Sequence, residues 1–267
     1  MQASFQDLSV LLVEPSGVQS RIIADLLAGL DVTRIEVVDS GEAALAWMRG
    51  DAPALTISAF YLPDMTGVDL LHQMRADEAL ATRPFVLVSS ETRPQMLDPV
   101  RQSGACAILP KPFSIEQLAT ALRAVIDYLN PSAMLDVDMD LEQLRVLLVD
   151  DSPNARKYVR HILGNLGIEE FIEAENGIEA MGILADTMVD LVITDYNMPE
   201  MDGRALVEHI RQQSWQSSVP ILMVTSESNM SRLAAVEQAG VSAICDKPFE
   251  PQMIKRLIEQ AITNREG

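Results

Sequence analysis

The sequence has few residues of the kinds that hold disulfide-rich proteins or zinc sites together. Its 267 residues include two cysteines and three histidines. Cys106 and Cys245 lie in different halves of the chain, with no second cysteine or histidine cluster at metal-ligand spacing. This pattern excludes a disulfide framework and a zinc site, and it predicts two small, buried, apolar side chains.

Long apolar runs and basic clusters are also missing. No apolar stretch approaches the roughly 20 residues of a membrane-spanning helix, and the N-terminus MQASFQDLSV lacks the features of a signal peptide. We therefore expect a cytoplasmic protein without a membrane partner. The net charge is −19, from 20 Lys and Arg against 39 Asp and Glu. Such a surface repels phosphate backbones, which argues against direct binding of nucleic acid.

The most informative pattern is an internal repeat. An offset of 136 residues, the difference between positions 199 and 63, aligns Pro63 with Pro199. The same offset aligns VLLV at 10–13 with VLLV at 146–149, Gly41 with Gly177, Gly67 with Gly203, and Lys-Pro-Phe at 111–113 with 247–249. A frame that holds without gaps through both halves predicts two copies of one fold.

Each copy alternates short apolar segments with amphipathic ones. In the second copy the expected strands are 146–149, 169–174, 190–194, 220–226 and 243–246. Five strand–helix units of this length predict an α/β fold, with a five-stranded parallel sheet and helices on both faces of each copy.

The boundary between the copies falls near Asn130-Pro131, which should end the last helix of the first copy. We place the domains at 1–129 and 144–267, with a linker over 130–143. The acidic residues of this linker fit either a continued helix or a loose segment.

Polar residues of the second copy stand where its strands end. Asp150 and Asp151 end the first strand, Asp195 the third and Thr225 the fourth, and Lys247 follows the fifth. The carboxyl ends of the strands meet at one edge of an open parallel sheet, where ligands bind. We therefore expect these five side chains to form one site.

The residue types at this edge favour a particular chemistry. Converging carboxylates repel one another, and a hard cation such as Mg²⁺ is the usual compensation. Lys247 adds a fixed positive charge for an anion such as a phosphoryl group, with Thr225 as a hydroxyl donor and Asp195 as the nucleophile. Taken alone, Asp151-Ser152-Pro153 would be read as a helix N-cap. The joint occurrence at successive strand ends favours the functional site.

The motifs LLVDDS, VITDYNMPEMDG, TSE and DKPF give the second copy a clear family resemblance. Over nearly its whole length it resembles the receiver domain of two-component response regulators, which have a flavodoxin-like (βα)5 fold. The resemblance implies that Asp195 accepts a phosphoryl group from a histidine kinase or a histidine phosphotransfer protein. It also implies that Lys247 and Thr225 contact the phosphoryl group. The implied Mg²⁺ ligands are Asp151 and Asp195 directly, Asp150 through water, and the backbone carbonyl of Asn197.

Three further positions bear on how such a receiver is tuned. Asn197 and Glu227, two residues after Asp195 and Thr225, resemble the single-domain chemotaxis regulators, whose phosphorylated state is short-lived. Many receivers carry Tyr or Phe three residues before the lysine, where this chain has Ile244. The resemblance then implies that the signal reaches the surface through packing shifts rather than through a hydroxyl–aromatic coupling.

The first copy keeps the frame but loses two of the three acids. Ala59 offers no oxygen, and Pro15 offers no side-chain ligand, so we predict a degenerate receiver that cannot be phosphorylated at this site. Lys111 is predicted to pair with Glu14, and Asp64 to point away from the site. The equivalents of Asp150, Asp151, Asp195, Thr225 and Lys247 are, in order, Glu14, Pro15, Ala59, Ser89 and Lys111.

The segment 93–104 of the first copy contains two prolines that its counterpart lacks. Pro94 suits a first helical turn, whereas Pro99 would cost about 3 kcal/mol inside a helix. We expect either a short or bent helix, or a helix that begins only at Pro99.

These patterns favour a phosphoacceptor signalling protein rather than an enzyme. The first domain would serve as a regulatory interaction module, and the output would pass to a downstream protein target or through a homodimer. Two alternatives stay open: the regulatory N-terminal portion of a longer regulator with an effector such as a cyclic-dinucleotide enzyme, and a scaffold that is not phosphorylated. A phosphatase of the haloacid dehalogenase type would need an acid at Asn197.

Overall fold

Each half of the chain folds around a five-stranded sheet in which every strand pair is parallel. The strand orders are β2-β1-β3-β4-β5 and, in the second half, β7-β6-β8-β9-β10, which is the same arrangement. This order is that of flavodoxin-like folds, so the predicted fold class is confirmed for both copies.

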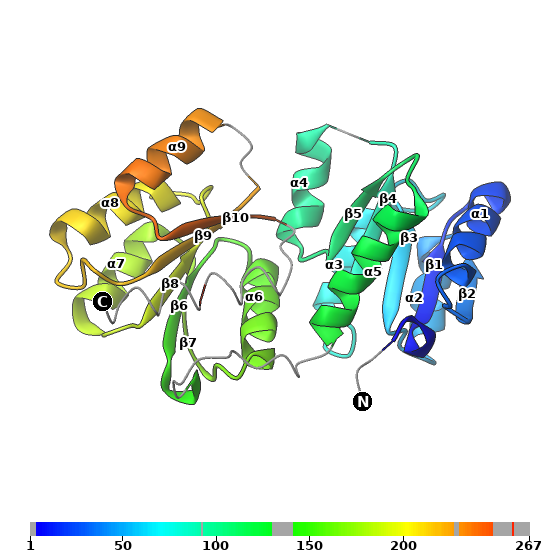
Figure 1. Cartoon of the computed structure of the whole chain (residues 1–267), viewed down its shortest axis with the longest axis horizontal. Coiled ribbons are helices and arrows are strands. Elements are labelled where there is room, and N and C mark those ends of the chain that lie inside the picture. Colours follow the sequence, from blue (N-terminus) through cyan, green and yellow to red (C-terminus); the bar gives the residue numbers. More distant parts are fainter. Residues whose placement is uncertain (1–3, 92, 130–140, 227–229, 248–257, 259–267) are drawn as a thin grey trace. The chain divides into compact units, whose positions relative to one another are not determined.

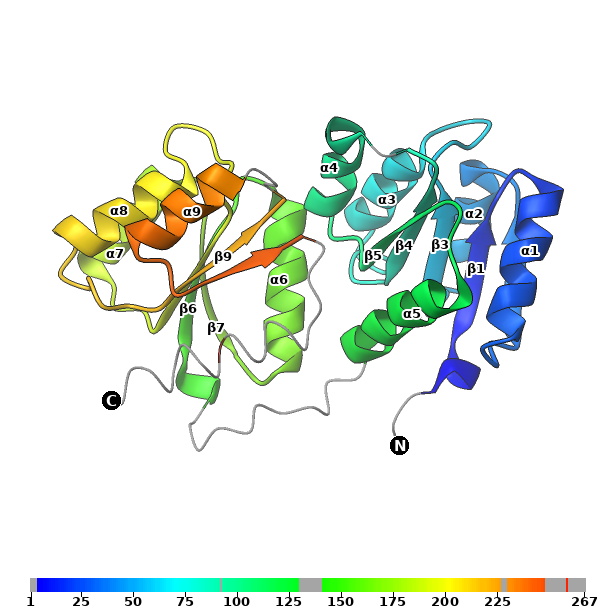
Figure 2. The same cartoon turned by 45° about the horizontal axis from the view of Figure 1, so that its top comes forward.

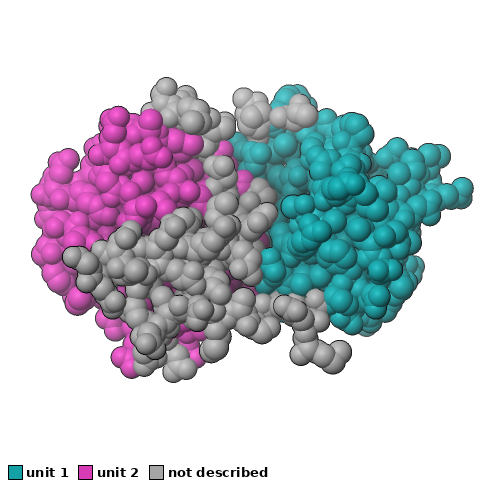
Figure 3. Space-filling model, in the orientation of Figure 1, with its two compact units in different colours: residues 1–130 teal, residues 131–267 magenta. Residues whose placement is uncertain are grey.

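The structure is a computed structural model, and it describes residues 4–91, 93–129, 141–226, 230–247 and 258 (Figure 1). The chain divides into two units, residues 1–130 and 131–267 (Figure 3). The predicted linker lies outside the described residues up to residue 140, and Leu141–Gln143 forms the short 3-10 helix η2.

The first unit begins with the 3-10 helix η1 at Phe5–Asp7. Its strands are β1 (Ser9–Val13), β2 (Arg34–Val38), β3 (Leu55–Ala59), β4 (Phe85–Ser89) and β5 (Ala107–Pro110). Its helices are α1 (Gly17–Ala28), α2 (Gly41–Met48), α3 (Gly67–Ala76), α4 (Pro94–Gln102) and α5 (Ile115–Leu129). Helices α1 and α5 contact each other on one face of the sheet, and α2, α3 and α4 cover the other (Figures 1 and 2).

The second unit repeats this plan in the residues that the structure describes. Its strands are β6 (Arg145–Val149), β7 (Glu170–Ala174), β8 (Leu191–Thr194), β9 (Ile221–Thr225) and β10 (Ala243–Asp246). Its helices are α6 (Pro153–Asn165), α7 (Gly177–Asp186), α8 (Gly203–Gln213) and α9 (Met230–Ala239). Helices α7, α8 and α9 pack side by side on one face of the sheet, and α6 lies on the other (Figure 2).

The central strands are buried because helices cover both of their faces. Every residue of β3 and β9 is buried, and so are Leu11 and Val13 in β1. The main cores pack β1 and β4 against α3 in the first unit, and β6, β8 and β9 against α8 in the second. Cys106 and Cys245 are buried free thiols, as the sequence predicts. Among the described residues, no helix combines the length and apolar character needed to cross a bilayer.

A tight loop after the third strand of each copy is built in the same way. The Gly203 N–H donates to the Tyr196 carbonyl at 2.9 Å, and the Gly67 N–H donates to the Phe60 carbonyl at 2.7 Å. A Cβ on Gly203 would collide with the Asp195 carbonyl, and a Cβ on Gly67 with its counterpart in the first copy. Glycine is therefore required in both loops, and the loop backbone is the same in the first copy, where Ala59 replaces Asp195.

Helix α4 runs through Pro99. It begins at Pro94 and has nine residues against ten in α9, so the prediction that the helix begins at Pro99 is wrong. The Leu97 N–H donates to the Arg93 carbonyl, and the Ser103 N–H donates to the Pro99 carbonyl, so helical bonding continues on both sides of the proline. The helix tolerates Pro99 by losing one N–H donor.

Candidate functional site

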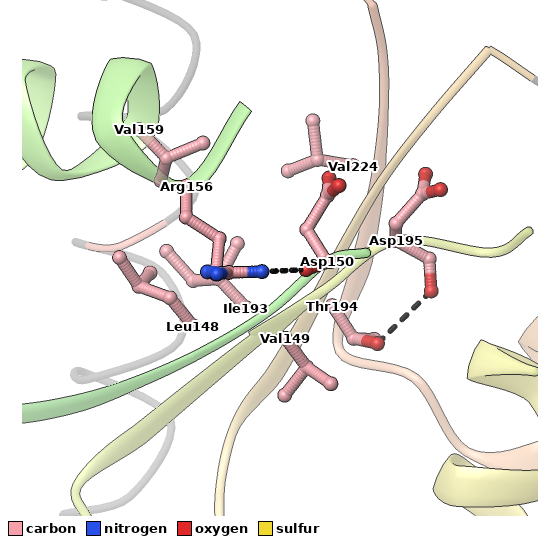
Figure 4. Close-up of a pocket in the computed structure, with 9 residues that line it drawn as sticks. All are labelled: Leu148, Val149, Asp150, Arg156, Val159, Ile193, Thr194, Asp195 and Val224. Atoms are coloured by element: carbon pink, nitrogen blue, oxygen red, sulfur yellow. Dashed lines mark hydrogen bonds between the residues drawn. The ribbon is translucent and has the colours of Figure 1, made fainter. Parts of the chain in front are cut away.

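The strand ends of the second copy bring four of the predicted side chains to one edge. Asp150 and Asp195 directly follow β6 and β8, Thr225 ends β9, and Lys247 directly follows β10. The Asp195 N–H donates to the Val149 carbonyl at 2.8 Å, and the Lys247 N–H donates to the Thr225 carbonyl at 2.7 Å. These bonds continue the hydrogen-bonding pattern of the sheet by one residue, so the backbone fixes the Cα positions of Asp195 and Lys247. Figure 4 shows the carboxylates of Asp150 and Asp195 pointing in the same direction.

An ion-pair network connects these side chains. The Lys247 ammonium donates to Asp150 Oδ2 at 2.7 Å and lies 3.2 Å from Asp195 Oδ1. The other oxygen of Asp150 accepts the Ser152 N–H at 2.9 Å. Lys247 and both carboxylates are buried, so solvent screens this network only weakly. The ammonium group of Lys247 therefore holds the carboxylates of Asp150 and Asp195 in place.

Asp151 brings a third carboxylate to the same edge. One carboxylate oxygen from each of Asp150, Asp151 and Asp195 lies within 4.8 Å of the other two. Carboxylate oxygens at this spacing suit a hard divalent cation, and Mg²⁺ in particular is held by a few carboxylates together with water. The residues present therefore fit the magnesium ion that the family resemblance implies for this site.

Burial changes the proton affinity of this cluster. It raises the pKa of Asp195 from 3.8 to about 6, because Lys247 offsets only part of the burial and the nearby Asp150 charge adds to it. Burial and the charge of Asp150 also raise the pKa of Asp151. Burial favours the neutral form of Lys247, but the two carboxylates outweigh it and raise its pKa. Without a metal, the site thus holds more negative charge than its lysine balances.

The remaining predicted positions of the second copy differ in burial, and one of them lies outside the described residues. Thr225 is completely buried at the end of β9. Asn197 is exposed in the loop after β8, and Ile244 is half-buried against the core. Glu227 lies outside the described residues. The roles assigned to these four residues stay predictions.

The first copy contains a smaller version of the same network. Lys111 Nζ donates to Glu14 Oε2 at 2.7 Å, which confirms the predicted pair. Glu14 Oε1 accepts the Ser16 N–H at 3.0 Å, as Asp150 accepts from Ser152. Glu14 thus takes the place of Asp150.

The other two acids have no counterpart here. Ala59 is buried at the end of β3, and Pro15 is exposed. Ser89 lies buried at the end of β4, where its hydroxyl accepts the Glu91 N–H at 2.9 Å. The site of the first copy therefore presents one carboxylate and one ammonium.

Asp64 does not take the position of Asp195 in the first copy. Its carboxylate accepts the Gly41 N–H at 2.9 Å and the Glu42 N–H at 2.7 Å, at the start of α2. These hydrogen bonds lower its pKa. The carboxylate is therefore committed to the helix N-terminus, where negative charge is favourable.

Sequence reasoning missed Arg156. This arginine of α6 lies against the acidic edge and donates to the Asp150 carbonyl at 2.6 Å (Figure 4). It also lines a small cavity behind Asp150 and Asp195. The available signal was its alignment with Ser20 in the copy that lacks the acids.

A parallel α/β sheet in the order of flavodoxin, with three acids and a lysine at its carboxyl edge, defines a receiver-type signalling domain. The family described as "Response regulator receiver domain" matches the chain twice, over residues 10–123 and 146–259. The chain belongs to this family and carries two receiver domains in tandem. Proteins of this family act in two-component signalling.

Several similar proteins are chemotaxis regulators. Chemotaxis protein CheY1 of Helicobacter pylori is 41% identical over 119 residues, which covers 43% of this chain and 94% of that protein. A CheY homolog of Campylobacter jejuni is 37% identical over 125 residues, covering 46% and 96%. The solved structure of Vibrio cholerae chemotaxis protein CheY4 is 33% identical, covers 44% of this chain and 98% of that one, and has a TM-score of 0.41.

Proposed function

We propose that the second domain, residues 144–267, is the phosphoacceptor of this chain and that Asp195 receives the phosphoryl group. The observation that supports this most directly is the convergence of three carboxylates and Lys247 at one sheet edge. The donor would be a phosphohistidine on a histidine kinase or a histidine phosphotransfer protein. The output would pass by contact with a protein target.

The proposed transfer places each side chain in a role. A carboxylate oxygen of Asp195 forms a bond to phosphorus while the bond from phosphorus to the donor's histidine nitrogen breaks, and that nitrogen keeps the electron pair. Lys247, already within 3.2 Å of Asp195, offsets negative charge on the phosphoryl oxygens. Thr225 supplies a hydroxyl donor at the neighbouring strand end.

Asp150, Asp151, Asp195 and the Asn197 backbone carbonyl would hold the magnesium ion. When bound, the ion neutralises charge on the phosphoryl oxygens and on the acids. Asn197 and Glu227 would tune the lifetime of the phosphorylated state, and Ile244 would transmit the change through packing.

This assignment is tested by phosphorylation of the full chain. Incubation with acetyl phosphate and Mg²⁺ is expected to add one phosphoryl group, detected by intact mass, and Asp195→Ala is expected to add none. Asp64→Ala is the control, because Asp64 lies in the equivalent loop of the first domain. A chain that takes no label, or a label that persists in Asp195→Ala, would contradict the proposal; the first outcome would favour an unphosphorylated scaffold.

We further propose that the first domain, residues 1–129, is a regulatory interaction module that cannot be phosphorylated at its degenerate site. At the positions equivalent to Asp195 and Asp151, both within the described residues, it carries Ala59 and Pro15, so its Glu14–Lys111 pair has neither an acceptor nor a second metal-binding acid there. Restoring the acceptor alone should therefore not restore the chemistry.

The double variant Ala59→Asp/Asp195→Ala is expected to stay unlabelled under conditions that label the wild type. A carboxylate at position 59 still lacks the partner that Pro15 cannot supply, and it would add negative charge beside the paired Glu14. Label located by peptide mapping at position 59 would show that the first site needs only its acceptor.

A further inference from the structure

Arg156 is a buried arginine that donates a hydrogen bond to the backbone of the acidic site. Its side chain is 9% exposed, and one guanidinium nitrogen donates to the Asp150 main-chain carbonyl at 2.6 Å. The same guanidinium pairs with Glu173 at 3.0 Å and with Glu175 at 3.4 Å. Glu173 lies in β7 and Glu175 directly follows it, so the arginine links α6, the end of β6 and β7.

The carbonyl that Arg156 holds belongs to the peptide between Asp150 and Asp151. Fixing the plane of this peptide sets the direction in which the chain leaves β6, and so sets where Asp151 begins. A planar guanidinium can hold a carbonyl and two carboxylates at once, because its donors form a rigid fork. A buried arginine also places positive charge under a site that has an excess of negative charge.

The first domain provides an internal comparison. The positions equivalent to Arg156, Glu173 and Glu175 are Ser20, Val37 and Asp39. Ser20 donates its hydroxyl to the Gly17 carbonyl within its own helix, and Val37 is exposed. The arginine and its glutamate in β7 are thus present only in the copy that has the three acids.

We propose that Arg156 is a positioning residue for the magnesium site of the second domain, acting through the Asp150 carbonyl. This inference rests on the proposed function of that site. Groups that orient the ligands of a metal typically change its affinity by about tenfold or more when removed.

Arg160 offers a matched control. It lies one turn further along α6, pairs with the same Glu173 at 3.4 Å and covers the Phe171 ring, but it is largely exposed. Arg160→Gln removes the same charge from the same helix as Arg156→Gln. A difference between the two variants therefore reports the contacts of Arg156 to the Asp150 carbonyl and to Glu175, rather than net charge.

The test measures Mg²⁺ binding to the full chain by isothermal titration. Arg156→Gln is expected to weaken binding by about tenfold, Arg160→Gln to leave it within about twofold, and Arg156→Lys to fall between, because a lysine keeps the charge but not the fork. In the metal-free chain, hydrogen exchange at the Ser152 amide should be faster in Arg156→Gln only, since this amide donates to the Asp150 carboxylate.

Wild-type Mg²⁺ affinity in folded Arg156→Gln, or an equal loss in Arg160→Gln, would overturn the inference. If Arg156→Gln does not fold, wild-type affinity in Arg156→Lys would overturn it instead. A wild-type chain that binds no Mg²⁺ contradicts the proposed function, whereas the metal-free exchange comparison still tests Arg156.

Discussion

Without magnesium, the second domain is expected to lose stability as the pH rises through the pKa of Asp195. The folded-state pKa is raised from 3.8 to about 6, so the folded protein binds this proton more tightly than the unfolded chain does. The resulting stability is fully present below pH 3.8 and is lost as the pH passes 6. The loss amounts to about 3 kcal/mol in the free energy of unfolding.

Comparison with Asp195→Asn isolates this effect from all other titrations. The variant's advantage over the wild type in urea unfolding should grow between pH 4 and pH 7, and saturating Mg²⁺ should remove it, because a ligand that binds only the folded state stabilises it. Asp186→Asn, which changes an exposed acid outside the cluster, is the control. An advantage that does not change with pH would mean that the Asp195 carboxylate is already compensated without metal.

The second large effect is expected in the first domain, where Lys111→Met should lower the free energy of unfolding by about 2 kcal/mol. The substitution leaves the buried Glu14 carboxylate without its cation. Removing one partner of a fully buried pair costs about 3–5 kcal/mol, and Lys111 is itself partly exposed, which reduces the loss.

The chain offers a direct readout for this experiment. Trp47 and Trp215 are its two tryptophans, one in each domain, so Trp215→Phe leaves a fluorescence probe of the first domain alone. Adding Glu14→Gln to Lys111→Met should recover most of the loss, because the carboxylate is then neutral. Arg21→Met, at an exposed position of α1 in the same domain, controls for loss of positive charge. An unchanged free energy of unfolding in Lys111→Met would show that the Glu14–Lys111 pair does not stabilise the first domain.

The fold was predictable because it depends on patterns that survive duplication. The apolar strand segments and the glycines at 67 and 203 stand at the same offset in both copies, and the structure places them in equivalent strands and turns. The Glu14–Lys111 pair was predictable for the same reason: topology brings both strand ends to one edge whatever the side chains are.

The parts that could not be predicted depend on side-chain direction and depth. Periodicity marks Arg156 as one polar residue of an amphipathic helix, and it cannot show that the guanidinium lies under the Asp150 carbonyl. Helix propensity counts the cost of Pro99 but not the packing of Val100 and Leu97 in the core, which keeps the helix intact around it. Tertiary contacts decide both cases.

The unequal charge of the two sites also bears on the lifetime of the chain. Lys111 faces one carboxylate, whereas Lys247 faces a cluster of three. Without metal, the second domain of a newly made chain should therefore open more often than it does with the ion bound. Proteases cut opened chains in proportion to how often they open. Metal binding would thus protect the second domain from degradation, while the turnover of the first domain stays independent of the ion.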